Sequence, residues 1–198
     1  MKPKINQVKN RGKTKMGNKN DKLSVFISLI LRHKPETIGI SLDEFGYANV
    51  EQLIAGTKES GRNLDLVTLK AIVLEDKKTR YSFNEDMTLI RANQGHSVKV
   101  NVHLAKLEPP ALLYHGTAKT ALESIQGSGI QKMNRLYVHL SENKETAFQV
   151  GKRHGSPVIL TVDSSSMQKD GYQFFLSANN VWQVEHVPAP YIIEDTAK

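Results

Sequence analysis

The apolar positions between residues 23 and 31 repeat at the spacing of a helix with one buried face. These apolar residues follow one another at i, i+3 and i+4 intervals, and they are Leu23, Phe26, Ile27, Ile30 and Leu31. Asp21 is a suitable capping residue for the start of this helix, and Pro35 disfavours helical geometry in the residue before it. The pattern predicts a helix from about residue 21 to residue 34, with Arg32 and His33 on its last turn.

The segment up to residue 102 adds two helices and several short strands. Asn49 and Asp65 are capping residues that precede apolar positions at helical spacing. Alternating apolar residues predict strands at 40–43, 81–83, 88–90 and 98–102, the middle two forming a hairpin. Helix, short strand, helix, helix and hairpin is the order of a winged-helix domain. Such domains usually bind nucleic acid, although some mediate only protein contacts.

The pattern changes after Glu108-Pro109-Pro110, which marks a domain boundary. Strands are predicted at 112–114, 136–140, 157–162, 174–175 and 181–184. Helices are predicted at about 118–126 and from Ser141 to Gly151. The fold class is therefore α+β, and the second half is mainly β. The predicted organisation is a tail over 1–20, a winged-helix lobe over 21–102, a linker over 103–110 and a second lobe over 111–198.

The positive charge of the chain is concentrated at its N-terminus. The 198 residues include 27 Lys and Arg against 20 acids, a net charge of +7. Residues 1–22 hold eight basic residues and one acid, so 8 − 1 = +7 and the remainder is near neutral. A basic segment without apolar periodicity predicts a disordered tail that suits a polyanion such as RNA. A purely solubilising extension is the equal alternative.

Composition excludes several classes of function. The chain has no cysteine, which excludes disulfides, thiol catalysis and cysteine-based zinc sites. No apolar run approaches the 18 residues of a membrane span, and no apolar stretch of signal-peptide type follows the basic N-terminus. We expect a cytoplasmic monomer that uses no metal.

Three arginines stand on predicted connectors, each close to a histidine. Arg32 ends the first helix, Arg91 begins the donor-rich heptad 91–97, and Arg153 lies between the glycines of 151–155. A guanidinium presents a planar fork to phosphate, and several of them stabilise charge that develops there. The pattern favours a phosphate site. The alternatives are a cation complementing the helix macrodipole for Arg32 and a solvated loop for the heptad.

Two histidines in the second half are further candidates for ligand binding. His115 precedes Gly116 and Thr117 at the predicted end of a buried strand, where a glycine lets a ligand approach the backbone. His139 lies in the middle of a predicted strand, and its side chain points away from the face of its two neighbours. A hydrogen-bonded core histidine is the alternative for His139.

These motifs, taken together, resemble the NAD-dependent tRNA 2′-phosphotransferase family. The matching segments are 31–36, Gly39, 42–44, 91–97, 114–117, 138–141 and 151–155, together with Ser177, Asn179, 181–182 and 186–188 near the end. Their order and spacing agree over roughly residues 22–193. The sequence departs from the family pattern at Tyr47, Tyr137 and Asn180, where Trp, His and Gly are usual. The resemblance implies a winged-helix lobe followed by a lobe of ADP-ribosyltransferase type.

The resemblance also implies site residues and partners. The family's catalytic group falls on Arg32, His33, Arg91 and Arg153. Residues that contact NAD, the co-substrate, are implied to be His115, Gly116, Thr117, Ser128, Gly129, Ile130, His139 and Leu140. The second partner is RNA that carries a 2′-phosphate.

The activity that the resemblance implies is removal of an internal RNA 2′-phosphate. The phosphate attacks the nicotinamide ribose of NAD and expels nicotinamide, and the neighbouring ribose hydroxyl then attacks phosphorus. The products are 2′-hydroxyl RNA and ADP-ribose 1″,2″-cyclic phosphate. One alternative is an ADP-ribosyltransferase acting on protein or nucleic acid, suggested by Gln183-Val184-Glu185. Another is a non-catalytic winged-helix RNA-binding protein.

Overall fold

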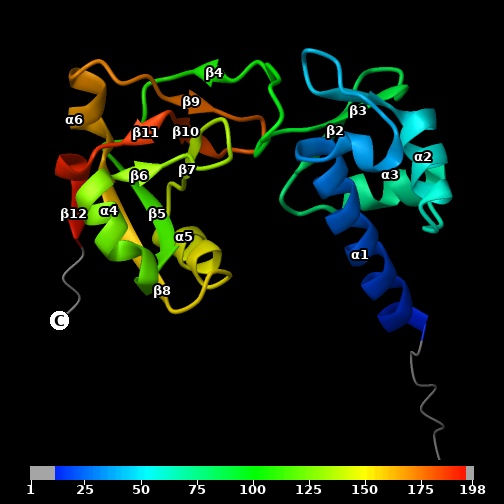
Figure 1. Ribbon diagram of the computed structural model, residues 1–198, viewed down its shortest axis with the longest axis horizontal. Helices are drawn as coiled ribbons and strands as arrows, with labels where there is room; N and C mark the ends of the chain where they lie inside the picture. Colours follow the sequence, from blue (N-terminus) through cyan, green and yellow to red (C-terminus); the bar gives the residue numbers. More distant parts are fainter. Residues whose placement is uncertain (1–11, 195–198) are drawn as a thin grey trace, which may run out of the picture.

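Two separate hydrophobic cores organise the protein. The computed structural model describes residues 12–194, and Figure 1 shows them as two groups of elements side by side. One core is built from side chains between Leu23 and Ala92, the other from side chains between Leu113 and Val187. We call residues 12–102 the N-terminal lobe and residues 105–194 the C-terminal lobe. Helices and small sheets occur together, so the α+β class is confirmed.

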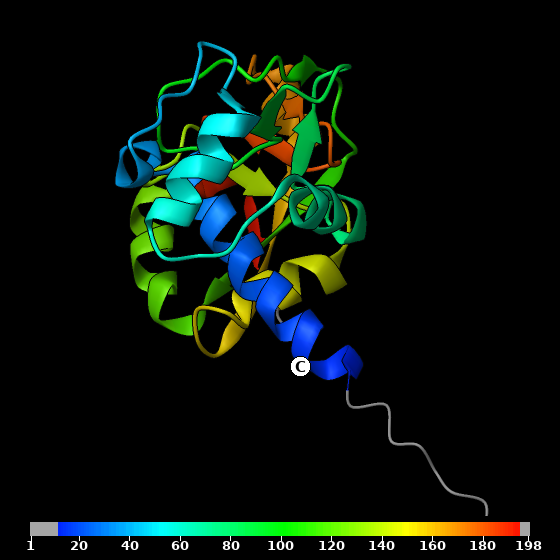
Figure 2. The ribbon, with the colours of Figure 1, turned by 90° about the vertical axis from the view of Figure 1, so that its right-hand side faces the viewer.

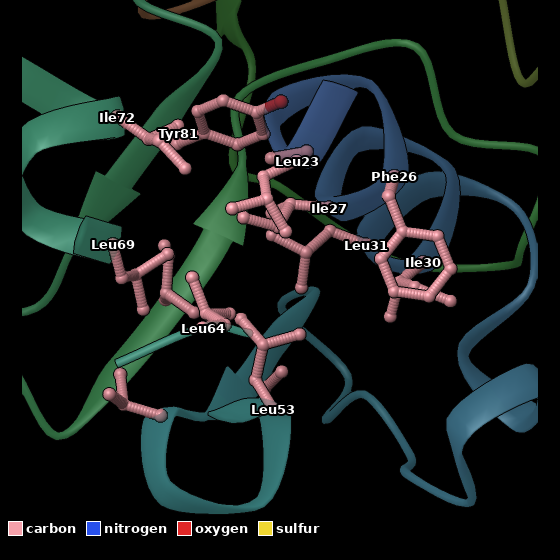
Figure 3. Packing of buried hydrophobic residues seen from close by; sticks show 14 of the residues in the cluster. Leu23, Phe26, Ile27, Ile30, Leu31, Leu53, Leu64, Leu69, Ile72 and Tyr81 are labelled. Carbon is pink, nitrogen blue, oxygen red and sulfur yellow. The ribbon is translucent and has the colours of Figure 1, made fainter. Parts of the chain in front are cut away.

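Helix α1 (Gly12–Arg32) supplies one wall of the first core. Figure 3 shows the side chains of Leu23, Ile27 and Leu31 pointing towards those of the facing elements. The apolar spacing thus predicted the buried face correctly. The described part of the helix starts at Gly12, so Asp21 lies within the helix and does not cap its start. Predictions for the first eleven residues lie outside the described residues.

Helices α2 (Val50–Glu59) and α3 (Leu66–Glu75) complete the helical part of this lobe. Both predicted caps are confirmed. The side chain of Asn49 accepts a hydrogen bond from the N–H of Gln52 at 3.0 Å, and that of Asp65 accepts one from Thr68 at 2.7 Å. In Figure 2, seen from the side of this lobe, α1 (blue) runs between α2 (cyan) and α3 (teal).

A three-stranded antiparallel sheet closes the N-terminal lobe in the order β1-β3-β2. Its strands are β1 (Tyr47–Asn49), β2 (Tyr81–Phe83) and β3 (Leu89–Ala92). The predicted hairpin is confirmed. The strand predicted at 40–43 is wrong, because the carboxylate of Asp43 accepts the N–H groups of Phe45 and Tyr47 and makes a turn. Alternation there reflects partial burial of Ile40 and Leu42.

The segment that joins the lobes also differs from its prediction. Residues 98–102 form no strand, although Val100 and Val102 line a small cavity described below. A short 3₁₀ helix, η1 (Pro35–Ile38), follows α1. Strand β4 (Ala105–Lys106) lies inside the expected linker and pairs with the C-terminal lobe. An alternation of apolar and polar residues shows that one face of a segment is buried, but it does not show that a partner strand lies beside that segment.

The C-terminal lobe consists of small antiparallel sheets and short helices. The sheet orders are β4-β9-β10-β7, β12-β8-β5 and β11-β6. The strands are β5 (Leu112–Ala118), β6 (Ile130–Gln131), β7 (Val138–Leu140), β8 (Pro157–Asp163), β9 (Phe175–Leu176), β10 (Trp182–Val184), β11 (His186–Val187) and β12 (Ile192–Glu194). The helices are η2 (Lys119–Ala121), α4 (Leu122–Ser128), α5 (Lys144–Gly151), α6 (Ser164–Lys169) and η3 (Ala189–Tyr191). The sequence patterns predicted β5, β7, β8, β9, β10, α4 and α5 approximately, and missed the shorter elements.

Two details of this lobe affect the site. His115, Gly116 and Thr117 lie in the last part of β5, as predicted, and the strand runs one residue further, to Ala118. Helix α5 is capped by Asn143 rather than Ser141, since the Asn143 side chain accepts the N–H of Thr146 at 2.8 Å. A Cβ atom at Gly116 would lie 1.6 Å from the carbonyl oxygen of Ala147. Glycine therefore allows α5 to pack directly on β5.

None of the described helices is long and apolar enough to cross a membrane.

Two helical glycines should respond oppositely to alanine. A Cβ at Gly56 would lie 2.4 Å from the carbonyl oxygen of Ile38, so Gly56→Ala should destabilise the fold by about 1–3 kcal/mol through overpacking. Gly127 has nothing within 4 Å of its Cβ position, so Gly127→Ala should stabilise by about 0.5–1 kcal/mol. Urea unfolding measures both. Equal effects of the two substitutions would show that α2 does not pack tightly against η1.

Candidate active site

A cavity of about 670 Å³ opens between the two lobes, and residues of both lobes line it. Its volume is in the range of small-molecule sites. Six cationic side chains line it, namely Arg32, Lys78, Arg80, Lys132, Arg135 and Arg153. The one acid among the described lining residues is Glu142, which accepts the indole N–H of Trp182 at 2.8 Å. The cavity is therefore suited to an anionic ligand.

Arg32 is held at the cavity by the end of helix α1. Its backbone carbonyl accepts the N–H of Ser97 at 2.9 Å, and its guanidinium packs over Gly95, whose Cβ position lies 3.6 Å from Cζ. The Nε and Nη2 atoms are buried and have no hydrogen-bond partner within the described chain. Burial is the main cause that lowers the pKa of Arg32 to about 10, so the group is still charged at neutral pH. Buried donors without a partner are costly unless a ligand accepts from them.

The other three predicted catalytic residues occupy different places. Arg153 is exposed on the connector after α5 and lines the cavity, as expected from its sequence position. The described lining of this cavity does not include His33 or Arg91. His33 faces a neighbouring hollow of about 460 Å³ beside α1, which we call the α1 groove. The structure thus brings Arg32 and Arg153 together at the cavity and places His33 and Arg91 outside its lining.

His33 and Arg91 are nevertheless held by specific contacts. The Nδ1 atom of His33 lies 2.9 Å from the hydroxyl of Ser97. Burial, followed by the charge of Arg32, lowers the pKa of His33 below its usual value. The guanidinium of Arg91 lies over the ring of Tyr47 at 4.8 Å and donates from Nη1 to the carbonyl of Phe45 at 3.5 Å. Its Nε atom is buried without a partner in the described chain.

His115 and His139 both line the cavity, and their partners fix their tautomers. The Nδ1 atom of His115 lies 3.1 Å from the carbonyl oxygen of His139, which only accepts, so this nitrogen carries the proton. Nη1 of Arg135 only donates, and it contacts Nδ1 of His139, which must therefore present a lone pair. In neutral rings, Nε2 of His115 is then an acceptor and Nε2 of His139 a donor.

Both rings are neutral at physiological pH. Burial, followed by the charge of Arg135, lowers the pKa of His139 to about 3. Burial also lowers the pKa of His115, while its hydrogen bond to the carbonyl of His139 opposes this. The pair offers one acceptor and one donor to a ligand in the cavity, the combination that a carboxamide or a ribose hydroxyl requires.

The remaining residues that the resemblance implied divide into two groups. Gly116 and Leu140 line the cavity. Thr117 is buried beside them in β5 and is not among the described lining residues. Ser128, Gly129 and Ile130 also fall outside that described lining, since they end α4 and begin β6. Gln131 and Lys132, the next two residues, reach the cavity instead.

The loop before β2 supplies Lys78 and Arg80, which sequence reasoning missed. The carboxylate of Asp76 accepts the backbone N–H groups of both residues and pairs with the guanidinium of Arg80. Across the lobes, the amide of Asn179 donates to the carbonyl of Lys78 at 3.0 Å. The basic run Lys77-Lys78 near Arg80 was the available signal, but its convergence with Arg32 depends on tertiary packing.

A second, smaller cavity of about 100 Å³ lies beside the first, and the two share Gln94 and Tyr137 in their linings. His96 and Gln183 line it and are 2% and 3% exposed. Nε2 of each has no partner within the described chain. Burial, followed by the charges of Arg32, His33 and Arg91, lowers the pKa of His96 to about 4. Folding therefore keeps this histidine neutral.

Among residues 12–194, no group of three or more His, Cys, Asp or Glu side chains is arranged to hold a metal ion.

Acid should destabilise the protein through His96. The ordinary pKa of histidine is 6.5, and that of His96 in the folded protein is about 4. Between these two pH values the unfolded chain binds a proton at His96 and the folded chain does not. The stabilisation present above 6.5 is thus lost on acidification, by up to roughly 3 kcal/mol. His96→Gln should flatten the dependence of the unfolding free energy on pH between 7 and 5, measured by urea titration. The exposed control His154→Gln should not, and identical slopes for all three proteins would contradict the assignment.

Comparisons with known proteins agree with these features. Residues 18–186 match the family described as RNA 2′-phosphotransferase, Tpt1 / KptA family. A probable RNA 2′-phosphotransferase of Fusobacterium nucleatum is 54% identical over 172 residues, covering 86% of this chain and 96% of that protein. One of Flavobacterium johnsoniae is 51% identical over 170 residues, covering 86% and 93%. One of Pseudomonas aeruginosa is 45% identical over 175 residues, covering 88% and 96%.

Proposed function

The chain belongs to the RNA 2′-phosphotransferase, Tpt1 / KptA, family of transferases, and we propose that it transfers an internal RNA 2′-phosphate to NAD. The RNA is left with a 2′-hydroxyl, and nicotinamide and ADP-ribose 1″,2″-cyclic phosphate are released. The observation that carries the proposal is the cationic cavity between the lobes, where Arg32 has two buried donors without a partner among residues 12–194.

The free donors of Arg32 suit a phosphate in particular. Nε–H and one N–H of Nη2 point in parallel from the same edge of a guanidinium, the edge that binds phosphate with two hydrogen bonds. Gly95 supports the guanidinium without adding a side chain above it. We propose that Arg32 binds the RNA 2′-phosphate at this edge, while Arg153 neutralises charge from the opposite lobe.

The C-terminal lobe has features that fit NAD. The acceptor of His115 and the donor of His139 can hydrogen-bond a carboxamide or a ribose hydroxyl. Arg135 and Lys132 line the same cavity and can neutralise a diphosphate. When bound, NAD supplies the ribose carbon that accepts the phosphate. We propose that residues 111–198 form an ADP-ribosyltransferase-like lobe that binds NAD, and that residues 21–102 form a winged-helix lobe that binds RNA.

The proposed catalytic group includes His33 and Arg91 together with Arg32 and Arg153. His33 is the one member that can exchange a proton near neutral pH, and its bond to Ser97 holds the ring in place. Arg91 is the first residue of the heptad that cradles Arg32; it packs on Tyr47, and its Nε donor has no partner in the described chain. His33 lines the α1 groove, where it can contact an RNA phosphate.

A protein- or nucleic-acid-directed ADP-ribosyltransferase is less well supported. Gln183 of the Gln-Val-Glu segment lines the smaller cavity and not the larger one in the described lining. The Glu185 carboxylate lies 3.2 Å from the ammonium of Lys132. Transfer to protein would also leave the cluster of arginines without a role.

Arg32→Ala should lower the rate of 2′-phosphate removal by about 10²–10³, the usual cost of losing one preorganised charged donor. Arg32→Lys should restore only part of it, because an ammonium lacks the two-pronged edge. The measurement is loss of phosphate from an oligonucleotide with one internal 2′-phosphate, incubated with NAD. Arg62→Ala is the control, since Arg62 stacks on Phe26 away from the cavity. Full activity of Arg32→Ala would remove the basis of the proposal.

His115→Ala and His139→Ala should weaken NAD binding and leave RNA binding largely intact. Each substitution removes a hydrogen bond worth about 1–3 kcal/mol when its partner is buried. Calorimetric titration with NAD, and a separate titration with the phosphorylated RNA, measure the two affinities. His186→Ala is the matched control, because His186 packs against the Tyr172 ring and is not among the described residues that line the cavity. Loss of RNA affinity with retained NAD affinity would reverse the assignment of the lobes.

A further inference from the structure

The α1 groove lies next to the cavity and shares one residue with it. Of the residues lining the groove, most come from helix α1, and they include the exposed apolar side chains of Val25 and Leu29. His33, at the end of the helix, and Arg80 and Tyr81, at the start of β2, complete the lining. Arg80 also lines the large cavity, so the two hollows meet at this guanidinium.

We infer that an RNA strand continues from the 2′-phosphorylated nucleotide across Arg80 and lies in the α1 groove. The inference rests on the proposed function, because an internal 2′-phosphate has nucleotides on both sides. A strand whose 2′-phosphate occupies the cavity must leave it along the protein surface. The groove that shares Arg80 with the cavity is such a path.

An ion pair with Asp76 holds the Arg80 side chain at this junction. Its guanidinium pairs with Asp76, whose side chain is 4% exposed, while the Arg80 side chain is 34% exposed. The Nη1 group of the guanidinium is thus held by a buried carboxylate, and the other N–H groups are available to a phosphate. Arg80 is also close enough to lower the pKa of Arg32 by charge repulsion, after the larger effect of burial. Two neighbouring guanidiniums match two neighbouring phosphates, the 2′-phosphate and the adjoining phosphodiester.

The walls of the groove are rigid and chemically suited to nucleotides. The hydroxyl of Tyr81 donates to the backbone carbonyl of Ser24 at 2.6 Å, which ties β2 to α1. His33 offers a ring for stacking, and Val25 and Leu29 offer apolar surface for bases and ribose. Asp21 stands at the far end, about 17 Å from Arg32 at 1.5 Å per helical residue. The acid makes that end unfavourable for phosphate, so the strand should leave the groove before it reaches Asp21.

A glutamate placed in the groove tests the inference. Val25 is 72% exposed, and Val25→Glu adds a negative charge to the groove wall without disturbing the core. Val67→Glu is the matched control, because Val67 is 78% exposed on α3 and outside the described lining of the groove. The readout is the ratio of kcat/KM for a ten-nucleotide RNA to kcat/KM for a dinucleotide, each with one internal 2′-phosphate. Thermal unfolding monitored by circular dichroism verifies that both variants are folded.

Val25→Glu should lower this ratio about fivefold through repulsion of the strand, and Val67→Glu should leave it unchanged. An unchanged ratio for Val25→Glu overturns the inference, whatever its effect on the absolute rates. A lower ratio for Val67→Glu alone places the strand along α3 and also overturns it. Failure of the proposed function gives a different result, since the unsubstituted protein would then remove phosphate from neither RNA.

Discussion

The burial of one face of helix α1 fixes both the N-terminal lobe and the position of Arg32. Five apolar side chains of this helix are at most 8% exposed, and each contributes about 1.5–3 kcal/mol of burial free energy. Because the helix is anchored along this face, its last residue is carried to a defined point at the edge of the lobe. The same anchoring sets the α1 groove on the opposite side of the helix. Core packing and site geometry thus share one cause.

The cavity exists only where the two lobes meet. Backbone and side-chain contacts join them there, including the hydrogen bond from the N–H of Leu136 to the carbonyl of His96 at 3.1 Å. This junction confines Arg32 among other cations, and buried charge without a counterion destabilises the folded state. An anionic ligand would relieve that cost.

The residues around His115 and His139 determine which ring nitrogen of each donates a hydrogen bond and which accepts one. His115 and His139 have the same ring, yet a carbonyl oxygen holds one as a donor at Nδ1 and a guanidinium holds the other as an acceptor. Burial keeps both neutral. The two Nε2 atoms therefore differ in hydrogen-bonding sense, which gives the cavity a directional pair where protonated rings would have offered two donors.

The sequence by itself determined the buried face of α1, the caps at Asn49 and Asp65, the hairpin and the longer strands of the second half. Each of these depends on neighbours in the chain, through side-chain periodicity or local hydrogen bonds. It also marked Arg32, Arg153, His115 and His139, whose surroundings carry short local signals and a family resemblance. Only the tertiary structure decided that Lys78, Arg80 and Arg135 join them, and that His33 and Arg91 lie outside the described cavity lining. Convergence of separate loops depends on how the lobes pack, and no local pattern encodes it. The two strands predicted at 40–43 and 98–102 failed for the same reason, because alternation records burial and a ladder requires a partner strand.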